Sequence, residues 1–192
     1  MDRSLVVAGL VLAAGFSRRF GSDKRCARLS SGLTLLGASL VVPCAQLEEV
    51  WVVLRPEDDS VALGVAEPVR VARSESAALG MGHSLASAMR TISKRSRADA
   101  MAIFLGDMPW ISADSLGYLL ALASPEHIVV PTFQDQPGHP VIFGRNFWPA
   151  LQCLSGDAGA KSVLQSNPHA IRHLQLNDPG ILQDLDRPEF IE

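Results

Sequence analysis

The sequence predicts a three-layer α/β/α domain whose central sheet is doubly wound and mostly parallel. Apolar runs recur along the chain, and each is continuous instead of alternating with polar residues. They occupy residues 5–12, 50–54, 69–72, 101–105 and 128–130. Such runs are typical of strands that helices cover on both faces, as in a parallel sheet. Helix-like stretches separate the runs, and this alternation of strand and helix is the order of a doubly wound fold.

Three helices are predicted between these strands. Residues 80–95 carry an apolar stripe with helical spacing, made by Met81, Leu85, Ala88, Met89 and Ile92. Ser112 is a good N-cap and predicts a helix that begins just after it. Residues 34–47 predict a weaker helix, which Pro43 would kink.

After residue 130 the pattern changes. Residues 131–140 are rich in turn formers, 141–143 predict a short strand, 157–165 a short helix, and a last strand begins at Ile171. We expect this part to complete a pocket over the carboxyl edge of the sheet, where open α/β sheets bind ligands. Residues 1–192 would then form one domain.

Composition and charge exclude several classes of protein. With 47% hydrophobic residues and a net charge of -3, the chain is not intrinsically disordered. An isoelectric point near 5.9 argues against a nucleic-acid binder. Residues 1–30 hold six basic and two acidic residues, whereas 173–192 hold one basic and five acidic. This split suggests a phosphate site and a metal or counter-charge site, with solvated surfaces as the alternative.

The three cysteines have no CxxC spacing, which favours neither a disulfide framework nor a zinc ribbon. We therefore expect a cytoplasmic protein. The apolar run at 5–14 imitates part of a signal peptide, but it is far shorter than the roughly 20 residues that span a membrane. No membrane association is expected.

A glycine-rich loop follows the first predicted strand and reads Leu12-Ala13-Ala14-Gly15-Phe16-Ser17-Arg18-Arg19-Phe20-Gly21-Ser22-Asp23-Lys24. Glycines let backbone N–H groups approach an anion, and Arg19 and Lys24 add the fixed charge that a polyphosphate needs. The spacing of Gly15, Gly21 and Lys24 excludes a Walker loop. Gly80-Met81-Gly82 fails the dinucleotide fingerprint, because Leu85 stands where the third glycine belongs. A simple turn is the alternative.

Carboxylates stand near the ends of two predicted strands. Asp107 follows strand 101–105 through Gly106, where it could hold Mg²⁺ on a nucleotide's phosphates or serve as an ordinary loop or cap residue. Asp184 and Asp186 alternate around Leu185, so on a strand both would point to one face. A solvated acidic tail is the alternative.

Serine and histidine side chains give weaker indications. Ser84 lies in the first turn of helix 80–95, where it could read a base edge or cap the helix. Gly138 and Pro140 restrict the backbone around His139. His169 and His173 have helical i, i+4 spacing, but Pro168 favours a strand, which would separate them.

The loop resembles the signature of the MobA-like nucleotidyltransferases, L-A-[AG]-G-x-S-x-R-M-G-x-x-K, and departs from it only at Phe20, where the family usually has Met. Further blocks that look like the family's follow in order: Gly80-Met81-Gly82-His83-Ser84-Leu85, Leu105-Gly106-Asp107-Met108-Pro109, Gly138-His139-Pro140-Val141, Gly156-Asp157-Ala158-Gly159-Ala160-Lys161 and Asp184-Leu185-Asp186-Arg187-Pro188-Glu189. Within the family, the blocks are most similar to the molybdenum cofactor cytidylyltransferase branch.

The resemblance implies a Rossmann-like fold of the nucleotide-diphospho-sugar transferase type. It also implies a Mg²⁺-dependent reaction that transfers CMP from CTP to the terminal phosphate of molybdopterin in the molybdenum cofactor and releases diphosphate. It implies catalytic roles for Lys24, Arg19 and Asp107, with Mg²⁺ on Asp107 and on Asp184 or Asp186. The implied nucleotide-binding residues are Leu12, Ala13, Ala14, Gly15, Ser17, Gly21, Gly80, Gly82 and Ser84. Those implied near the acceptor are Gly138, His139, Asp157 and Lys161.

Two alternatives stay open. A guanylyltransferase or another small-molecule nucleotidyltransferase is one. Ala14 is similar to the cytidylyl branch, since the guanylyl branch usually has glycine there, but an aspartate before the lysine, here Asp23, is common in guanylyl enzymes. The other alternative is a non-catalytic chaperone that passes the molybdenum cofactor to a client molybdenum hydroxylase. The intact Lys24 and Asp107 speak against it.

Overall fold

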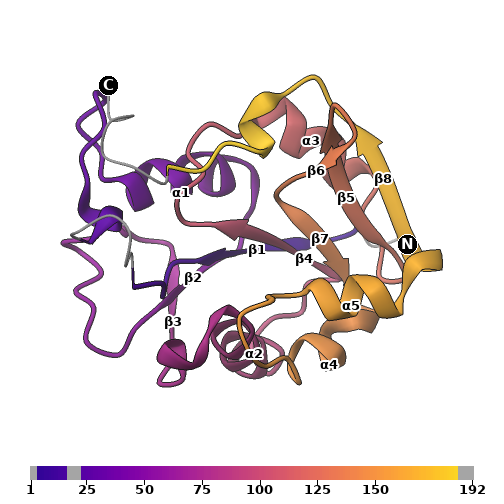
Figure 1. The fold of residues 1–192 in the computed structure, drawn as a ribbon, viewed down its shortest axis with the longest axis horizontal. Helices are drawn as coiled ribbons and strands as arrows, with labels where there is room; N and C mark the ends of the chain where they lie inside the picture. The colour runs from indigo at the N-terminus through magenta and orange to yellow at the C-terminus, as the bar shows by residue number, and fades with distance from the viewer. Residues whose placement is uncertain (1–3, 17–22, 186–192) are drawn as a thin grey trace.

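A computed structural model describes residues 4–16 and 23–185. Its centre is an eight-stranded sheet with the order β3-β2-β1-β4-β7-β5-β6, in which β8 also pairs with β5 (Figure 1). The strands are β1 (Val7–Leu12), β2 (Val50–Leu54), β3 (Arg70–Arg73), β4 (Ala100–Leu105), β5 (Ile128–Phe133), β6 (Gln136–Pro137), β7 (Val141–Gly144) and β8 (Ile171–Gln175).

Helices cover both faces of the sheet, which confirms the predicted three layers. On one face lie α1 (Leu35–Gln46) and α3 (Ala113–Ala121); on the other lie α2 (Met81–Ile92), α4 (Trp148–Leu151) and α5 (Lys161–Ser166) (Figure 1). Single 3₁₀ turns are η1 (Lys24–Cys26), η2 (Ala77–Leu79), η3 (Arg145–Phe147), η4 (Pro168–Ala170) and η5 (Pro179–Ile181). Each layer of helices buries its own hydrophobic core, with Leu36 and Leu116 in one and Leu85 and Trp148 in the other.

The sheet is mostly parallel, as predicted. β1 pairs in parallel with β2 and β4, β2 with β3, and β5 with β8. β6 and β7 are exceptions that the apolar pattern did not predict, since β7 runs antiparallel to both β4 and β5, and β6 runs antiparallel to β5. Only residues 134–140 separate β5 from β7. A parallel crossover needs about a dozen residues or more, so this short connection forces the chain to reverse.

Ser112 caps its helix as predicted, and Thr34 caps the helix predicted over 34–47. Thr34 accepts a hydrogen bond from the Gly37 N–H at 3.0 Å, and Ser112 accepts one from Ser115 at 3.1 Å. α1 continues through the buried Pro43 to Gln46 without a break.

The second half of the chain differs in detail from its prediction. α5 begins at Lys161 instead of 157. Asp184 and Leu185 belong to no strand, so strand alternation does not orient Asp184, and Asp186 lies outside the described residues. The segment after 130 extends the sheet through β7 and β8 and supplies α4 and α5, because its apolar residues pack into the core. Among the described residues, its contribution to the pocket at the carboxyl edge of the sheet is Asp157.

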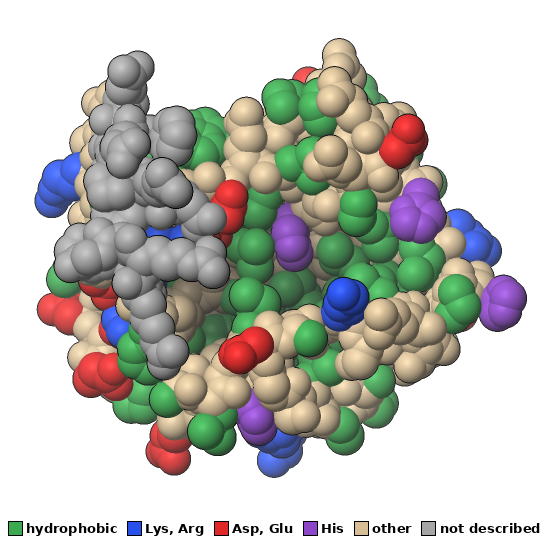
Figure 2. Space-filling view, in the orientation of Figure 1, with side chains coloured by type: hydrophobic (Ala, Val, Ile, Leu, Met, Phe, Trp, Pro, Cys, Tyr) green, Lys and Arg blue, Asp and Glu red, His purple; other side chains and the backbone are tan. Residues whose placement is uncertain are grey.

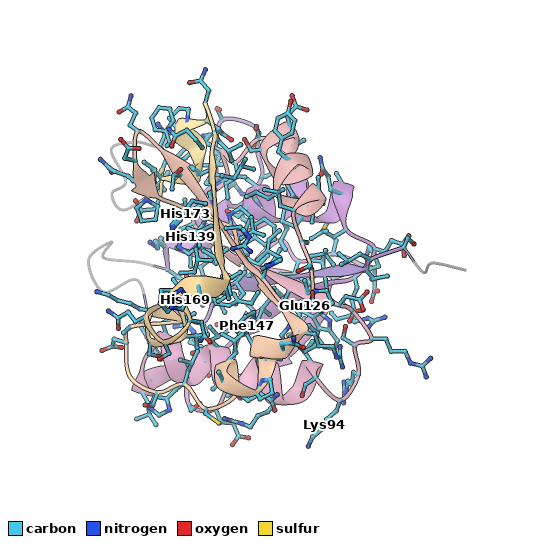
Figure 3. The ribbon with its side chains drawn as sticks, turned by 90° about the vertical axis from the view of Figure 1, so that its right-hand side faces the viewer. Lys94, Glu126, His139, Phe147, His169 and His173 are labelled. Carbon is cyan, nitrogen blue, oxygen red and sulfur yellow. The ribbon has the colours of Figure 1, made fainter. Side chains whose placement is uncertain are left out.

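His169 and His173 do not form a pair on a helix, which confirms the prediction. His169 lies in η4 and His173 in β8. Their side chains lie apart along the edge of the sheet in Figure 3. Within residues 4–16 and 23–185, every helix is too short or too polar to cross a membrane.

Candidate active site

A pocket of about 470 Å³ opens where β1 and β4 end. Three segments form most of its lining: residues 12–16 after β1, residues 77–81 at the start of α2, and residues 105–107 after β4. Lys24, Arg25, Ser84 and Asp157 complete the lining. Figure 2 shows the same face of the molecule hollowed near its centre, with hydrophobic side chains on the floor of the hollow. A pocket of this size suits a small ligand such as a nucleotide.

The glycine-rich loop and strand β4 meet in one ion pair. Lys24 Nζ lies 2.6 Å from Asp107 Oδ2, and both side chains are about one-fifth exposed (19% and 20%). The two residues are therefore within reach of a ligand while still paired. Gly106 permits this approach, because a Cβ there would lie 3.0 Å from that of Ala13 and 3.1 Å from the Leu12 carbonyl oxygen.

The C-terminal segment joins this pair. The Leu185 N–H donates to the Asp107 carbonyl at 3.0 Å, and Lys24 Nζ lies 3.5 Å from the Leu185 carbonyl oxygen. Residues separated by more than 150 positions thus share one edge of the pocket. Ser17, Arg19, Gly21 and Asp186, which the sequence assigned to the site, lie outside the described residues.

Arg25 is a residue of the pocket that the sequence analysis missed. Its side chain is only 4% exposed, and it forms ion pairs with Asp23 and Asp58. Burial alone would lower the pKa of Arg25, but the hydrogen bonds that it donates to Asp23 and Asp58, together with their negative charge, outweigh burial and raise that pKa. The available indication was the acidic Glu57-Asp58-Asp59 directly beyond strand β2, where a loop basic residue could find a partner.

The start of α2 forms the opposite wall. Gly82 donates its N–H to the Gly156 carbonyl at 2.8 Å, and a Cβ on Gly80 would lie 2.5 Å from that same oxygen. Gly80, with φ 117°, is the N-cap of the helix. The alternative that Ser84 caps α2 is therefore wrong. Ser84 is buried in the pocket wall, and its hydroxyl donates to the Gly80 carbonyl at 3.4 Å.

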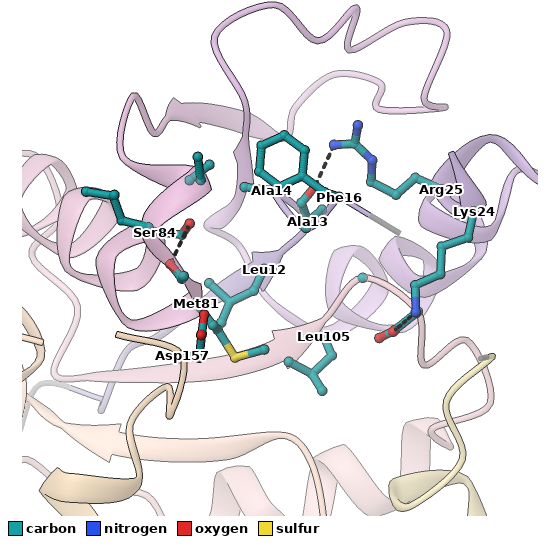
Figure 4. A pocket seen from close by; sticks show the side chains of 17 residues that line it. Leu12, Ala13, Ala14, Phe16, Lys24, Arg25, Met81, Ser84, Leu105 and Asp157 are labelled. Atoms are coloured by element: carbon teal, nitrogen blue, oxygen red, sulfur yellow. Dashed lines mark hydrogen bonds and ion pairs between the residues drawn. The ribbon is translucent and has the colours of Figure 1, made fainter. Parts of the chain in front are cut away.

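The four residues expected near the acceptor do not form one cluster. Asp157 lines the pocket across from Lys24 (Figure 4). Lys161 is exposed at the start of α5 and does not line the pocket. Gly138 packs against Ile181, and His139 donates its backbone N–H to the Ile181 carbonyl at 2.9 Å. Of these four residues, only Asp157 lines the pocket.

His139 carries the one buried polar side-chain atom without a partner among the described residues, its Nδ1. Burial lowers the pKa of His139, although a backbone hydrogen bond at Ile103 and the nearby Asp107 and Asp184 oppose that shift. A neutral imidazole is the result.

Carboxylate oxygens suit Mg²⁺, and Asp107 offers a carboxylate just beyond the end of β4. Within residues 4–16 and 23–185, however, no cluster of three or more His, Cys, Asp or Glu side chains has the arrangement of a metal site. A site built from the described residues alone would therefore rely on ligand oxygens to complete its coordination, as Mg²⁺ commonly does with phosphates.

Comparison with known proteins agrees with this geometry. The profile of the MobA-like NTP transferase domain matches residues 9–173. "Purine catabolism protein PucB" of Bacillus subtilis (strain 168) is 36% identical over 97% of this chain and 95% of its own. "Nicotine blue oxidoreductase" of Paenarthrobacter nicotinovorans is 28% identical over 95% and 93%.

Solved structures give the same result. The homologue of Mycobacterium tuberculosis Rv0371c from Mycobacterium sp. strain JC1 superposes with a TM-score of 0.81 and 30% identity, covering 95% of this chain and 91% of that one. The manganese complex of Rv0371c from M. tuberculosis H37Rv has a TM-score of 0.70 and 26% identity, over 89% and 88%. The chain belongs to the MobA-like NTP transferase family and is a nucleotidyltransferase.

Proposed function

We propose that this nucleotidyltransferase transfers CMP from CTP to the terminal phosphate of molybdopterin in the molybdenum cofactor and releases diphosphate. The observation that carries the proposal is the Lys24–Asp107 pair, which joins the glycine-rich loop to the end of β4 inside a pocket of nucleotide size. A lysine and a carboxylate at this place supply the two kinds of charge that phosphoryl chemistry needs.

In the proposed reaction, an oxygen of the acceptor phosphate attacks the α-phosphorus of CTP. The new P–O bond forms as the bond between the α-phosphorus and its bridging oxygen breaks, and the leaving electron pair departs with diphosphate. The acceptor phosphate is ionised at neutral pH, so no side chain has to remove a proton from it. Lys24 would stabilise the negative charge that grows on the α-phosphate, and Arg19 with the loop backbone would hold the leaving diphosphate.

A divalent cation belongs to this proposal, and we expect Mg²⁺. When bound, it would neutralise the phosphates and align them. Asp107 would be its main protein ligand, with Asp184 or Asp186 as the second. Support comes from the manganese complex of a relative that is 26% identical. Lys24, at 2.6 Å, would keep the Asp107 carboxylate oriented toward the pocket.

The acceptor would approach from the side of His139. The His139 Nδ1 is buried and unpartnered among the described residues, so a ligand would satisfy it only after a local shift of the ring or its surroundings. Gly138 would keep the chain close enough to Ile181 to position this ring, and Lys161 would add positive charge at the rim. Asp157 lines the nucleotide pocket itself, so we place it beside the nucleotide instead of the acceptor.

CTP is favoured over GTP because Asp23, the residue that is common in guanylyl enzymes, has another explanation here. Asp23 pairs with Arg25 and Arg55 inside the protein. Its presence before Lys24 is therefore accounted for without reference to the base. Ala14, which lines the pocket, remains as the feature similar to the cytidylyl branch. The surface thiols Cys26, Cys44 and Cys153 suit a reducing cytoplasm, where we place the reaction.

The test is a competition assay. Molybdenum cofactor is incubated with equal CTP and GTP and with Mg²⁺, and the dinucleotide product and diphosphate are quantified. We expect CMP incorporation to dominate, and diphosphate release to be lost in Asp107→Ala. Dominant GMP incorporation would overturn the choice of base. Cofactor binding with no diphosphate release by the wild type would favour the non-catalytic chaperone.

A further inference from the structure

Arg25 is held in a way that only an arginine allows. Its Nη1 and Nη2 donate to Asp58 Oδ2 and Oδ1 at 2.6 and 2.7 Å, which is a two-pronged contact. Nε donates to Asp23 Oδ1 at 2.8 Å, and Nη1 also donates to the Ala13 carbonyl at 2.6 Å (Figure 4). The planar guanidinium fits this arrangement, whereas a lysine ammonium cannot reproduce it.

These contacts join both ends of the glycine-rich loop. Ala13 begins the loop, and Asp23 and Arg25 close it. Asp58 comes from the segment after β2 and is itself fixed, since it accepts the Arg55 backbone N–H at 2.8 Å and is only 6% exposed. The two ends are therefore tied to a rigid third segment.

Arg55 repeats the connection from the same segment. Its guanidinium lies 4.9 Å from the centre of the Phe16 ring and donates to Asp23 Oδ2 at 2.7 Å. Phe16 belongs to the first half of the loop and Asp23 to the second. We call Asp23, Arg25, Arg55 and Asp58 the loop clasp.

We propose that the loop clasp positions the nucleotide-binding loop, with Arg25 as its central positioning residue. Lys24 stands between two members of the clasp in the single turn η1, so its backbone is fixed on both sides while Nζ reaches Asp107. A loop whose ends are already fixed loses less conformational freedom when a triphosphate binds, and it holds Lys24 in the reactive geometry. The inference rests on the proposed function only in that a nucleoside triphosphate binds this loop.

The test is Arg25→Lys, which keeps the charge and removes the two-pronged contact. We expect KM for the nucleotide to rise and kcat to fall, each about tenfold, because a small misplacement of reacting groups can lower the reaction rate by up to 10²-fold. KM for the acceptor should stay within twofold. This split distinguishes positioning of the nucleotide loop from general loss of structure.

Arg145→Lys is the matched control. Arg145 is also a partly buried arginine, which donates to the Ala98 carbonyl at 2.6 Å and stacks on Trp148 at 4.5 Å, and it does not line the pocket. We expect this variant to lose thermal stability with unchanged kinetic constants. Arg55→Gln provides a second clasp variant should Arg25→Lys fail to fold, and it should raise the nucleotide KM in the same direction.

A folded Arg25→Lys with nucleotide KM and kcat within twofold of the wild type would overturn the clasp. Equal changes in KM for nucleotide and acceptor would also overturn it. Failure of the proposed function is separate: if the wild type transfers GMP instead of CMP, the same comparison is made with GTP. Thermal stabilisation by CTP, GTP and UTP with Mg²⁺, which should be smaller in Arg25→Lys, measures nucleotide binding without any acceptor.

Discussion

At the scale of single residues, Lys24 combines a weak structural role with a strong proposed chemical one. Its partly exposed pair with Asp107 is of the kind worth about 1 kcal/mol or less to stability. A fixed charge beside a developing phosphate charge is typically worth 10²–10³ in turnover. We therefore expect Lys24→Ala to fold and to lose at least tenfold in kcat, measured by diphosphate release. Unchanged kcat in the folded variant, checked by its melting temperature, would show that Lys24 does not act on the phosphates.

Residues also differ in how far the sequence could assign them. Lys24 and Asp107 were predicted to share a site, and the structure joins them, because the loop that leads to Lys24 follows β1 and Asp107 follows the neighbouring parallel strand β4. Arg25 and Asp58 were missed, since 33 positions separate them and a charged residue in a polar loop is usually solvated. The acidic run at 57–59 indicated that a basic partner could exist, but the local pattern did not show which residue that partner is.

At the scale of elements, continuous apolar runs predicted strands well where both faces are covered. The run at 50–54 is β2 with all five residues buried. The same pattern could not predict which neighbour a strand pairs with, so the antiparallel β7 appeared only in the structure. Alternation in the sequence could say only that Asp184 and Asp186 would share one face if they stood on a strand, whereas the structure attaches this segment through the hydrogen bond from the Leu185 N–H to the Asp107 carbonyl.

Two helical glycines give an element-scale prediction. A Cβ on Gly82 of α2 would lie 2.6 Å from the Ser155 carbonyl oxygen, which is backbone and has to move. We expect Gly82→Ala to lower the free energy of unfolding by about 1–3 kcal/mol. Gly117 of α3 is the matched control, because its nearest neighbour would be Gln46 Oε1 at 3.8 Å. Gly117→Ala should raise stability by about 0.5–1 kcal/mol through helix propensity. Urea unfolding measures both, and equal effects would contradict the close approach of α2 to residues 155–156.

At the scale of the whole molecule, the end of the glycine-rich loop and the C-terminal segment come together. Lys24 Nζ pairs with Asp107 and lies 3.5 Å from the Leu185 carbonyl oxygen. Asp178 fixes the route of this C-terminal segment. It accepts hydrogen bonds from the Ser115 hydroxyl at 2.7 Å and the Ser112 N–H at 3.0 Å, at the start of α3, and from the Gly180 N–H at 2.9 Å.

We therefore predict that the contribution of the Asp178 carboxylate to the stability of the protein is lost in acid. Burial alone would raise the pKa of its carboxyl, but the hydrogen bonds from Ser115, Ser112 and Gly180 outweigh it and hold that pKa below the ordinary 3.8. The stabilisation is present above pH 3.8 and is lost as the pH falls through the lower pKa of the folded state.

We expect Asp178→Asn to lower the free energy of unfolding by about 1–2 kcal/mol at pH 7. Because the amide does not titrate, the gap in unfolding free energy between wild type and variant should shrink steadily below pH 3.8. Urea unfolding from pH 7 to pH 2.5 measures this gap, and a constant gap would contradict the prediction. Ser115→Ala, which removes one of the donors, should give a smaller gap with the same dependence on pH.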